Sequence, residues 1–327
     1  MGLSIDNDGK MKHNIPNKFN REKIPFSEEP NMKRLLLIMN PMAGTKKANP
    51  HLHEILTVFR RAGYECLTFM TLKRGDGTEL AAKYADSVDL IVCIGGDGTF
   101  NEIISGVCSV NAKTPIGYIP AGSTNDFASS LNLSKDVVRA ARDIVEGRPI
   151  NYDVGRFQNR FFTYVASFGA FTKTSYATSQ SVKNVLGHMA YLLGGVKELT
   201  SLHRCHVETI LDGKTRLEGD YIFGAISNST SVGGILTLDP EIVDLNDGLF
   251  EVMYVKYPSN ISQLTEIIRA ITTQDYNSPM LSFHPASYVT VHADPSMDWT
   301  LDGEFAKGEA TLEIENLRSA IRLMVND

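Results

Sequence analysis

The residues best suited by type and spacing to bind a ligand or carry out chemistry lie in the run Gly95 to Glu102, Gly-Gly-Asp-Gly-Thr-Phe-Asn-Glu. An apolar stretch, Leu90 to Ile94, precedes it and a helical pattern follows, which predicts a strand, a glycine turn and a helix N-terminus. Glycines allow close backbone approach, and free N–H groups with the helix dipole favour an anion such as phosphate. Asp97 places a carboxylate in that anion site, which is consistent with a bridging cation such as Mg²⁺. A tight strand-to-helix connection without a ligand is the alternative.

Two further loops rich in small residues follow predicted strands. Asn40 to Gly44 comes after the buried strand Arg34–Met39, and Pro120 to Phe127 comes after the strand Ile116–Ile119. Because ligands gather at the carboxyl ends of parallel strands, the three loops are expected to form one cleft.

Composition limits the classes of protein that remain. The 327 residues suggest two domains, and the formal net charge of −6 argues against a nucleic-acid binder. No apolar stretch approaches the ~18 residues needed to span a bilayer. Four cysteines without a C-x-x-C spacing predict neither a zinc site nor a disulfide framework and favour a reducing cytosol.

The pattern of apolar residues divides the chain into three parts. Residues 1–31 lack an apolar period and are expected to be a disordered extension or a leader. From Lys33 strands and helices alternate, which predicts a parallel α/β sheet, with one helix beginning at Ser134 as N-cap. From Tyr152 onward, short strand-like runs separated by Asp-Gly turns predict an all-β domain.

Two helical insertions are expected within that all-β part, near Val182–Leu199 and at Ser259–Thr273. The apolar side of the first is interpreted as a core-facing stripe, with contact to a membrane as the alternative.

Four motifs in a fixed order make the sequence recognisable. N-P-x-A-G at Asn40, G-G-D-G-T-x-N-E at Gly95, G-S-T-N-D-F-A at Gly122 and L-D-G-E at Leu301 resemble the soluble bacterial diacylglycerol kinases and the related sphingosine and ceramide kinases. The resemblance covers the chain from Met32 to the end. G-G-D-G-T alone is shared with NAD kinases.

The resemblance implies an ATP site across the first three motifs. The implied ATP-contacting residues are Asn40, Pro41, Met42, Ala43, Gly44, Thr71, Gly95, Gly96, Asp97, Gly98, Thr99, Phe100, Asn101, Ser123 and Asp126. Asp97 would help to hold Mg²⁺ and the phosphates, with Asp126 in the same charged network. The family usually has Thr where this chain has Ser123, and the hydroxyl is kept.

Glu304 and Asp97 are the expected catalytic residues. The family's catalytic acid follows an Asp-Gly dipeptide as Glu304 follows Asp302 and Gly303. A carboxylate within ~3 Å of a lipid hydroxyl can accept its proton as the γ-phosphoryl group transfers. An ordinary hairpin with a solvated glutamate is the alternative.

The resemblance also implies a second, structural Mg²⁺ site in the β domain, made by the Asp247 carboxylate and the backbone carbonyls of Asp244 and Leu249. Asn-Asp-Gly is equally a plain turn signal.

Basic residues follow the first loop (Lys46, Lys47) and Thr71 (Lys73, Arg74). They are interpreted either as contacts for an anionic membrane surface or as solvated charges.

We therefore expect an α/β nucleotide-binding domain over 32–155, completed by 305–327, and a β-sandwich-like domain over 156–304. The expected activity is ATP- and Mg²⁺-dependent phosphorylation of diacylglycerol, or a similar lipid, to phosphatidic acid by a cytoplasmic protein peripheral to the inner membrane face. Kinases of sphingoid, other lipid-alcohol or NAD acceptors, and a silent lipid- or nucleotide-binding regulator, stay open. A homodimer also stays open.

Overall fold

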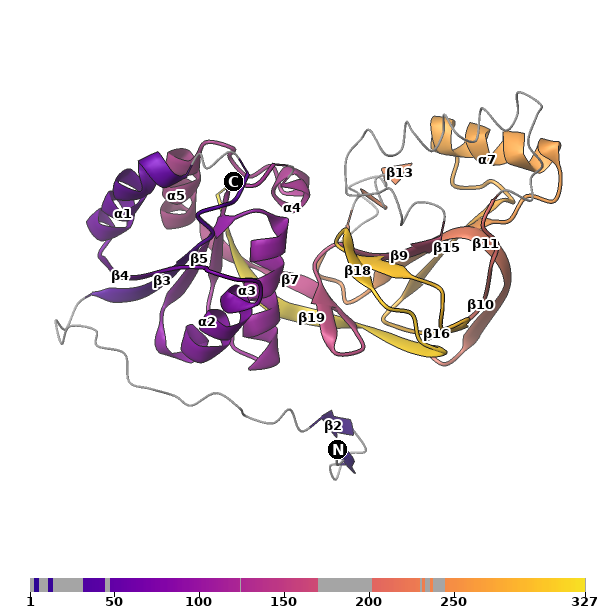
Figure 1. The fold of residues 1–327 in the computed structure, drawn as a ribbon, viewed down its shortest axis with the longest axis horizontal. Coiled ribbons are helices and arrows are strands. Elements are labelled where there is room, and N and C mark those ends of the chain that lie inside the picture. The colour runs from indigo at the N-terminus through magenta and orange to yellow at the C-terminus, as the bar shows by residue number, and fades with distance from the viewer. Residues whose placement is uncertain are drawn as a thin grey trace.

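The computed structural model describes residues 3–5, 11–13, 32–44, 48–123, 125–169, 202–229, 231–232, 236–237 and 245–326. For residues 3–5, 11–13, 126, 231–232 and 236–237 it describes the backbone alone. These residues form two lobes (Figure 1). Of the expected extension 1–31, the structure describes strands β1 (Leu3–Ile5) and β2 (Met11–His13), which pair antiparallel. The helix expected near Val182–Leu199 lies outside the described residues.

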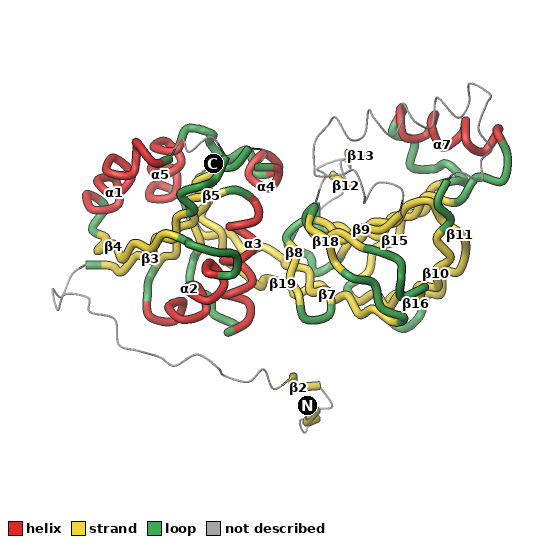
Figure 2. Tube along the Cα trace, viewed as in Figure 1, coloured by secondary structure: helices red, strands yellow, loops and turns green. Residues whose placement is uncertain are grey.

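The N-terminal lobe is a parallel sheet with helices on both faces (Figure 2). Its parallel strands lie in the order β4-β3-β5-β6. The strands are β3 (Lys33–Met39), β4 (Tyr64–Met70), β5 (Leu90–Gly95) and β6 (Ile116–Pro120). The helices are η1 (Asn49–His51), α1 (Leu52–Arg61), α2 (Asp76–Tyr84), η2 (Ala85–Ser87), α3 (Asp97–Ser109), α4 (Asp126–Ser130) and α5 (Val137–Glu146).

Alternate side chains of β3 serve two separate cores. Leu35 and Leu37 pack with Phe59 of α1 and Ile144 of α5, among other residues. Leu36 and Ile38 belong to the core that α2 and α3 cover on the opposite face. A strand buried on both faces is an unbroken apolar run, which is why the sequence favoured a parallel sheet.

Helix α5 begins later than the sequence suggested, and the expectation that Ser134 is its N-cap was wrong. Asp136 is the N-cap, and its Oδ1 accepts hydrogen bonds from the backbone N–H groups of Val138 (3.1 Å) and Arg139 (2.8 Å). The Ser134 hydroxyl instead accepts the Asp136 N–H at 3.2 Å. The carboxylate wins because it satisfies two free N–H groups and complements the helix dipole.

The C-terminal lobe is built from antiparallel strands and helix α7 (Ile261–Thr273), which confirms the second helical insertion. The strands are β7 (Arg148–Phe157), β8 (Arg160–Phe162), β9 (Val165–Gly169), β10 (Cys205–Leu211), β11 (Thr215–Ser227), β12 (Ser231–Val232), β13 (Leu236–Thr237), β14 (Phe250–Lys256), β15 (Leu281–Ala286), β16 (Tyr288–Ala293), β17 (Trp299–Leu301), β18 (Glu304–Ala306) and β19 (Thr311–Val325).

Two cores support this lobe. The fully buried Trp299 packs against Phe157 and Phe168 in the interior, with ring centroids 5.3 and 4.9 Å apart. Helix α7 covers a second apolar cluster that includes Phe223 and Met253. An α/β lobe followed by an all-β lobe is the architecture that the sequence predicted. No helix in the described part of the chain is long and apolar enough to cross a membrane.

Strands β7 and β19 run through both lobes (Figure 1). They pair antiparallel from Ile314 and Phe157 at one end to Val325 and Arg148 at the other. Strand β19 also pairs antiparallel with β16 in the β lobe and parallel with β6 through Leu323 and Ile116. Strand β19 therefore joins the strands of the two lobes into one continuous sheet.

Asp153 lies at the crossing between the lobes, where β19 changes register between Leu317 and Ile321. Its fully buried carboxylate accepts the N–H of Ser319 at 2.6 Å and that of Gly248 at 2.7 Å. Burial raises the pKa of this carboxyl, and the two hydrogen bonds oppose that rise. Asp153 thus fixes the bulge of β19 and the neighbouring turn.

Replacing this carboxylate should weaken the joint between the lobes. Asp153→Ala should lower the free energy of unfolding by about 2–3 kcal/mol, because two inward-facing N–H groups lose their acceptor. Asp153→Asn should cost less, since its amide oxygen keeps one of the two bonds. Urea unfolding followed by Trp299 fluorescence measures both, and an unchanged midpoint for Asp153→Ala would contradict this role.

Candidate active site

The three small-residue loops meet at the carboxyl ends of β3, β5 and β6. Gly44 has φ +50°, and a Cβ there would lie 2.5 Å from the Ala121 carbonyl oxygen. A Cβ on Gly122 would lie 2.6 Å from the Cα of Gly96. Such backbone-to-backbone packing leaves no room for side chains, so glycine is required at these positions.

Polar contacts hold the loops to one another. The Asn40 Nδ2 donates to the Thr99 hydroxyl at 3.1 Å, and its Oδ1 accepts the Met42 N–H at 2.9 Å. Asp97 Oδ1 accepts the Phe127 N–H at 3.3 Å, which ties the second loop to the third. Hydrogen bonds within the protein therefore hold these loops, which form one wall of the site, in place.

Helix α3 begins in this wall at Asp97, after Gly96 as N-cap, and none of the side chains that the structure describes caps it. Its first N–H groups and its dipole consequently favour a negative group at this end. A helix N-terminus reached through glycines is a known way to bind phosphate.

A cleft of about 430 Å³ lies against these loops. Among the described residues, its lining comes from the loops and the start of helix α3 in the first lobe and from Glu304 in the second. The lining residues are Asn40, Met42, Ala43, Gly44, Thr71, Leu72, Lys73, Arg74, Gly96, Gly98, Thr99, Glu102, Gly122 and Glu304. Five of these residues were absent from the ATP site that the sequence suggested, namely Leu72, Lys73, Arg74, Glu102 and Gly122.

Other residues of that suggested ATP site do not line the cleft. These are Pro41, Gly95, Asp97, Phe100, Asn101 and Ser123, while the Asp126 side chain lies outside the described atoms. Phe100 is buried and stacks on Tyr118 with ring centroids 4.3 Å apart. Gly95 makes room for Thr99, whose Cβ would lie 2.7 Å from a Cβ at position 95. Both residues shape the loop from behind.

Glu102 holds the loop that follows β4. Its carboxylate accepts the N–H groups of Gly75 at 2.8 Å and Gly77 at 3.1 Å. Asp76 turns the same loop by accepting the N–H groups of Leu72 and Lys73. Sequence reasoning assigned only Thr71 of this loop to the ATP site, although Gly75-Asp76-Gly77 repeats the glycine and aspartate signal that marked the other loops.

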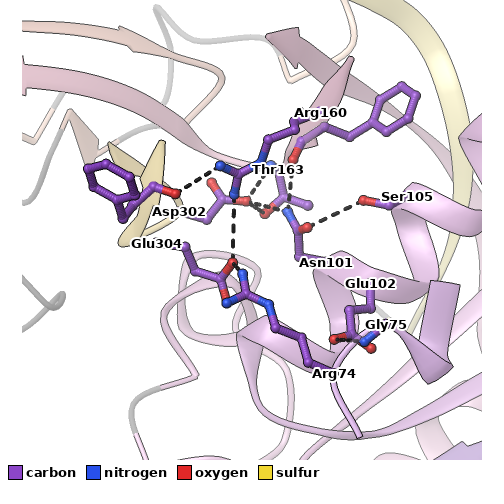
Figure 3. A network of polar contacts seen from close by, with 11 residues as sticks. Arg74, Gly75, Asn101, Glu102, Ser105, Arg160, Thr163, Asp302 and Glu304 are labelled. Carbon is purple, nitrogen blue, oxygen red and sulfur yellow. Dashed lines mark hydrogen bonds and ion pairs between the residues drawn. The ribbon is translucent and has the colours of Figure 1, made fainter. Parts of the chain in front are cut away.

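Glu304 reaches the cleft from the β lobe (Figure 3). It follows the β17–β18 turn, in which Asp302 and Gly303 both have positive φ, as a two-residue Asp-Gly hairpin requires. Its Oε2 lies 2.5 Å from Arg74 Nη2 and 3.8 Å from Arg160 Nη2. A Cβ on Gly98 would lie only 3.6 Å from Glu304 Oε1, so the phosphate loop and this carboxylate face each other.

Asp302 fixes the turn that carries Glu304. Its carboxylate accepts the N–H groups of Thr163 (2.6 Å), Tyr164 (3.0 Å) and Val165 (3.1 Å), together with the Thr163 hydroxyl (2.8 Å). Asn101 Nδ2 of helix α3 donates a further bond at 2.9 Å. Burial raises the pKa of Asp302, and the bonds from residues 163–165 oppose that rise.

Asn101 therefore faces the β lobe (Figure 3). Its Nδ2 also donates to the Phe161 carbonyl at 3.3 Å, and its Oδ1 accepts the Ser105 hydroxyl at 3.4 Å. Both ends of the amide are thus engaged within the protein. The geometry makes Asn101 a link between α3 and the Glu304 turn.

The turn expected to hold a structural cation is described only in part. Asp247 Oδ1 accepts the Leu249 N–H at 2.8 Å, whereas Asp244 lies outside the described residues. Within the described ranges, no three His, Cys, Asp or Glu residues form a metal-binding group. Glu251 leaves a buried Oε2 without a hydrogen-bond partner among them, and burial with the charge of Asp247 raises its pKa to about 8.

Comparison with known proteins agrees with this architecture. Residues 34–157 match the model of the diacylglycerol kinase catalytic domain, and residues 165–325 match that of the YegS C-terminal NAD kinase beta sandwich-like domain. The match to this catalytic domain identifies a lipid kinase.

Curated relatives give the family. A diacylglycerol kinase of Bacillus subtilis (strain 168) is 35% identical over 302 residues, covering 90% of this chain and 97% of that protein. One from Staphylococcus carnosus (strain TM300) is 29% identical and covers 89% and 94%. A crystal structure of a diacylglycerol kinase from Bacillus anthracis str. Sterne shares the fold, with a TM-score of 0.68 at 21% identity over 90% and 97% of the two chains. The chain belongs to the diacylglycerol kinase family, which confirms the resemblance noted in its motifs.

The Asn101–Asp302 contact should affect catalysis more than nucleotide binding. Asn101→Ala removes one of the bonds that align the Glu304 turn, so turnover should fall about tenfold. The KM for ATP should change by less than about threefold, because the amide does not line the cleft. Steady-state kinetics measure both values, with the exposed Asn277→Ala as control. A large rise in KM with unchanged turnover would instead place Asn101 on the nucleotide.

Proposed function

We propose that this chain transfers the γ-phosphoryl group of ATP to the free hydroxyl of diacylglycerol, giving phosphatidic acid at the cytoplasmic face of a membrane. The observation that carries the proposal is that Glu304 of the β lobe lines the same cleft as the glycine loops of the α/β lobe. The names of the relatives supply the acceptor.

The residues of the cleft suit each part of that reaction. Gly44, Gly96 and Gly98 with the start of α3 offer N–H groups to phosphate oxygens. Glu304 accepts the proton of the acceptor hydroxyl while that oxygen bonds to phosphorus and the bond to the leaving ADP breaks. Catalysis then depends on the distance between the phosphate wall and Glu304, which the contacts of Asp302 set.

Mg²⁺ belongs to the proposal on the chemistry of the donors. Asp97 puts a carboxylate at the start of α3, and carboxylate oxygens are ligands that Mg²⁺ prefers. When bound there, the ion would neutralise charge on the transferring phosphoryl group. At the second site, the buried Glu251 oxygen without a partner in the described residues and the neighbouring Asp247 form a carboxylate-rich place that a cation would stabilise.

The cleft has features suited to a membrane surface. Leu72 is 92% exposed and Met42 is 68% exposed, and both line the cleft beside Lys73 and Arg74. Exposed apolar and basic side chains together favour anionic bilayers, at about 1 kcal/mol for each basic residue. Lys46 and Lys47 lie outside the described residues.

Variants of the two acidic residues test the mechanism. Glu304→Gln should lower turnover by about 10²–10⁴-fold, because the amide cannot accept the proton, and Asp97→Ala should abolish transfer. The assay follows labelled phosphate from ATP to diacylglycerol in mixed micelles, with the exposed Glu309→Gln as control and circular dichroism to confirm folding. Full activity in either variant would remove that residue from the mechanism.

The same assay with sphingosine, monoacylglycerol and NAD identifies the acceptor. Diacylglycerol should give the most product. A stronger signal with another acceptor would reassign the substrate, and the absence of product with every acceptor would favour a regulator.

The second cation site has a readout that does not involve activity. Millimolar Mg²⁺ should raise the unfolding free energy by about 1–3 kcal/mol if it exceeds the dissociation constant 10- to 100-fold. Asp247→Asn should lose this gain. Asp294→Asn should keep it, because Asp294 caps its own turn in the same way, through the Ser296 N–H. Thermal unfolding with Mg²⁺ or EDTA measures the effect, and an equal gain in both variants would contradict the site.

A further inference from the structure

Arg74 connects the loop after β4 to the carboxylate proposed as base (Figure 3). Its Nη2 lies 2.5 Å from Glu304 Oε2, although 230 residues separate the two in sequence. The arginine side chain is 76% exposed, so it reaches over the cleft rather than packing in a core. It lines the same cleft as Gly96 and Gly98.

The backbone beneath Arg74 is held in place. Glu102, in the second turn of α3, accepts the N–H groups of Gly75 and Gly77, and Asp76 accepts that of Lys73. The residues on either side of Arg74 are therefore anchored, partly to the helix whose N-terminus forms the phosphate wall. The long side chain can change partners while its Cα keeps its distance from that wall.

The ion pair conflicts with the role of Glu304 as a base. Oε2 of Glu304 is bonded to the Arg74 guanidinium, and Arg160 Nη2 lies 3.8 Å from the same oxygen, which leaves only Oε1 of the carboxylate to take a proton. Arginine keeps its charge under all ordinary conditions, so it cannot itself accept the proton. Oε2 becomes available to the acceptor hydroxyl as well once Arg74 takes another partner.

A terminal phosphate is a suitable partner. It offers several charged oxygens in a geometry that a guanidinium binds through two parallel N–H groups. Arg160 is less able to exchange, because its Nη1 donates to the Phe305 carbonyl at 2.8 Å. Arg74, with Glu304 as its one ion-pair partner among the described residues, has only that contact to give up.

We propose that Arg74 binds the terminal phosphate of the nucleotide and, in leaving Glu304, frees the Oε2 atom of that carboxylate for the acceptor hydroxyl. This inference rests on the proposed function. An exposed ion pair with no role in the reaction is the alternative, since such pairs contribute at most about 1 kcal/mol to stability.

Nucleotide binding without acceptor separates the two readings. Isothermal titration with Mg²⁺-ATP and Mg²⁺-ADP is carried out on the wild type, Arg74→Gln, Glu304→Gln and the double variant. Arg74→Gln should weaken ATP binding by at least about tenfold, as expected for losing a hydrogen bond to a charged group. ADP binding should change by less than threefold, because ADP lacks the phosphate concerned.

The double variant tests the exchange itself. Glu304→Gln should strengthen ATP binding several-fold in the protein that has Arg74, because no ion pair must be broken first, and by clearly less in the Arg74→Gln background. Equal effects in the two backgrounds would show that the residues act independently and would overturn the exchange.

Two further variants complete the design. Arg216→Gln is the matched control, since Arg216 is an exposed arginine paired with Glu208 and Glu218 on the β lobe. Arg74→Lys keeps the charge but loses the paired N–H groups, so its ATP affinity should fall between wild type and Arg74→Gln. If Arg74→Gln binds ATP like the wild type, or loses ATP and ADP equally, the inference fails and the proposed function stands. If the wild type binds no ATP, the proposed function fails and the inference with it.

Discussion

The cleft depends on one buried carboxylate. Asp302 accepts hydrogen bonds from three consecutive N–H groups and a hydroxyl at residues 163–165, and from Asn101 of the other lobe. A buried charge without partners is very costly, whereas one surrounded by donors holds all of them in place. The turn that presents Glu304 is thus fixed on both sides, and one of its supports comes from the helix that begins at the phosphate wall.

The larger framework serves the same purpose. Strands β7 and β19 run unbroken through both lobes, and Asp153 fixes the bulge where they cross from one to the other. Within the α/β lobe, close backbone packing at Gly44 and Gly122 holds the loops to one another. Such preorganisation of the loops suits a phosphoryl-transfer site, because catalysis there depends mainly on positioning and electrostatics.

The sequence predicted what depends on local pattern. Apolar runs and small-residue turns located β3, β5 and β6 with their loops, and Asp-Gly dipeptides indicated the antiparallel lobe. It did not predict contacts between distant residues. Asn101 and Asp302 lie 201 positions apart, so nothing local showed that the amide would turn toward the β lobe rather than the nucleotide. Glu102 is similar: its motif was noticed, but its partners at Gly75 and Gly77 follow from the packing of α2 on α3. The wrong N-cap was predicted for helix α5 because Ser134 and Asp136 are both good capping residues and lie two positions apart. Only the three-dimensional structure shows which of them caps the helix.

The last strand has a consequence for how the chain reaches this fold. Strand β19 pairs with β6 in the α/β lobe, with β16 in the β lobe and with β7 across both lobes. As the chain emerges from a ribosome, the α/β lobe is made first, yet the edge of β6 that β19 covers stays open until the final strand appears. Open strand edges attract unwanted partners, and incomplete domains are prone to association. The nascent protein therefore passes through a stage in which a nearly complete first lobe must avoid pairing with its neighbours, until a single late segment joins the strands of the two lobes.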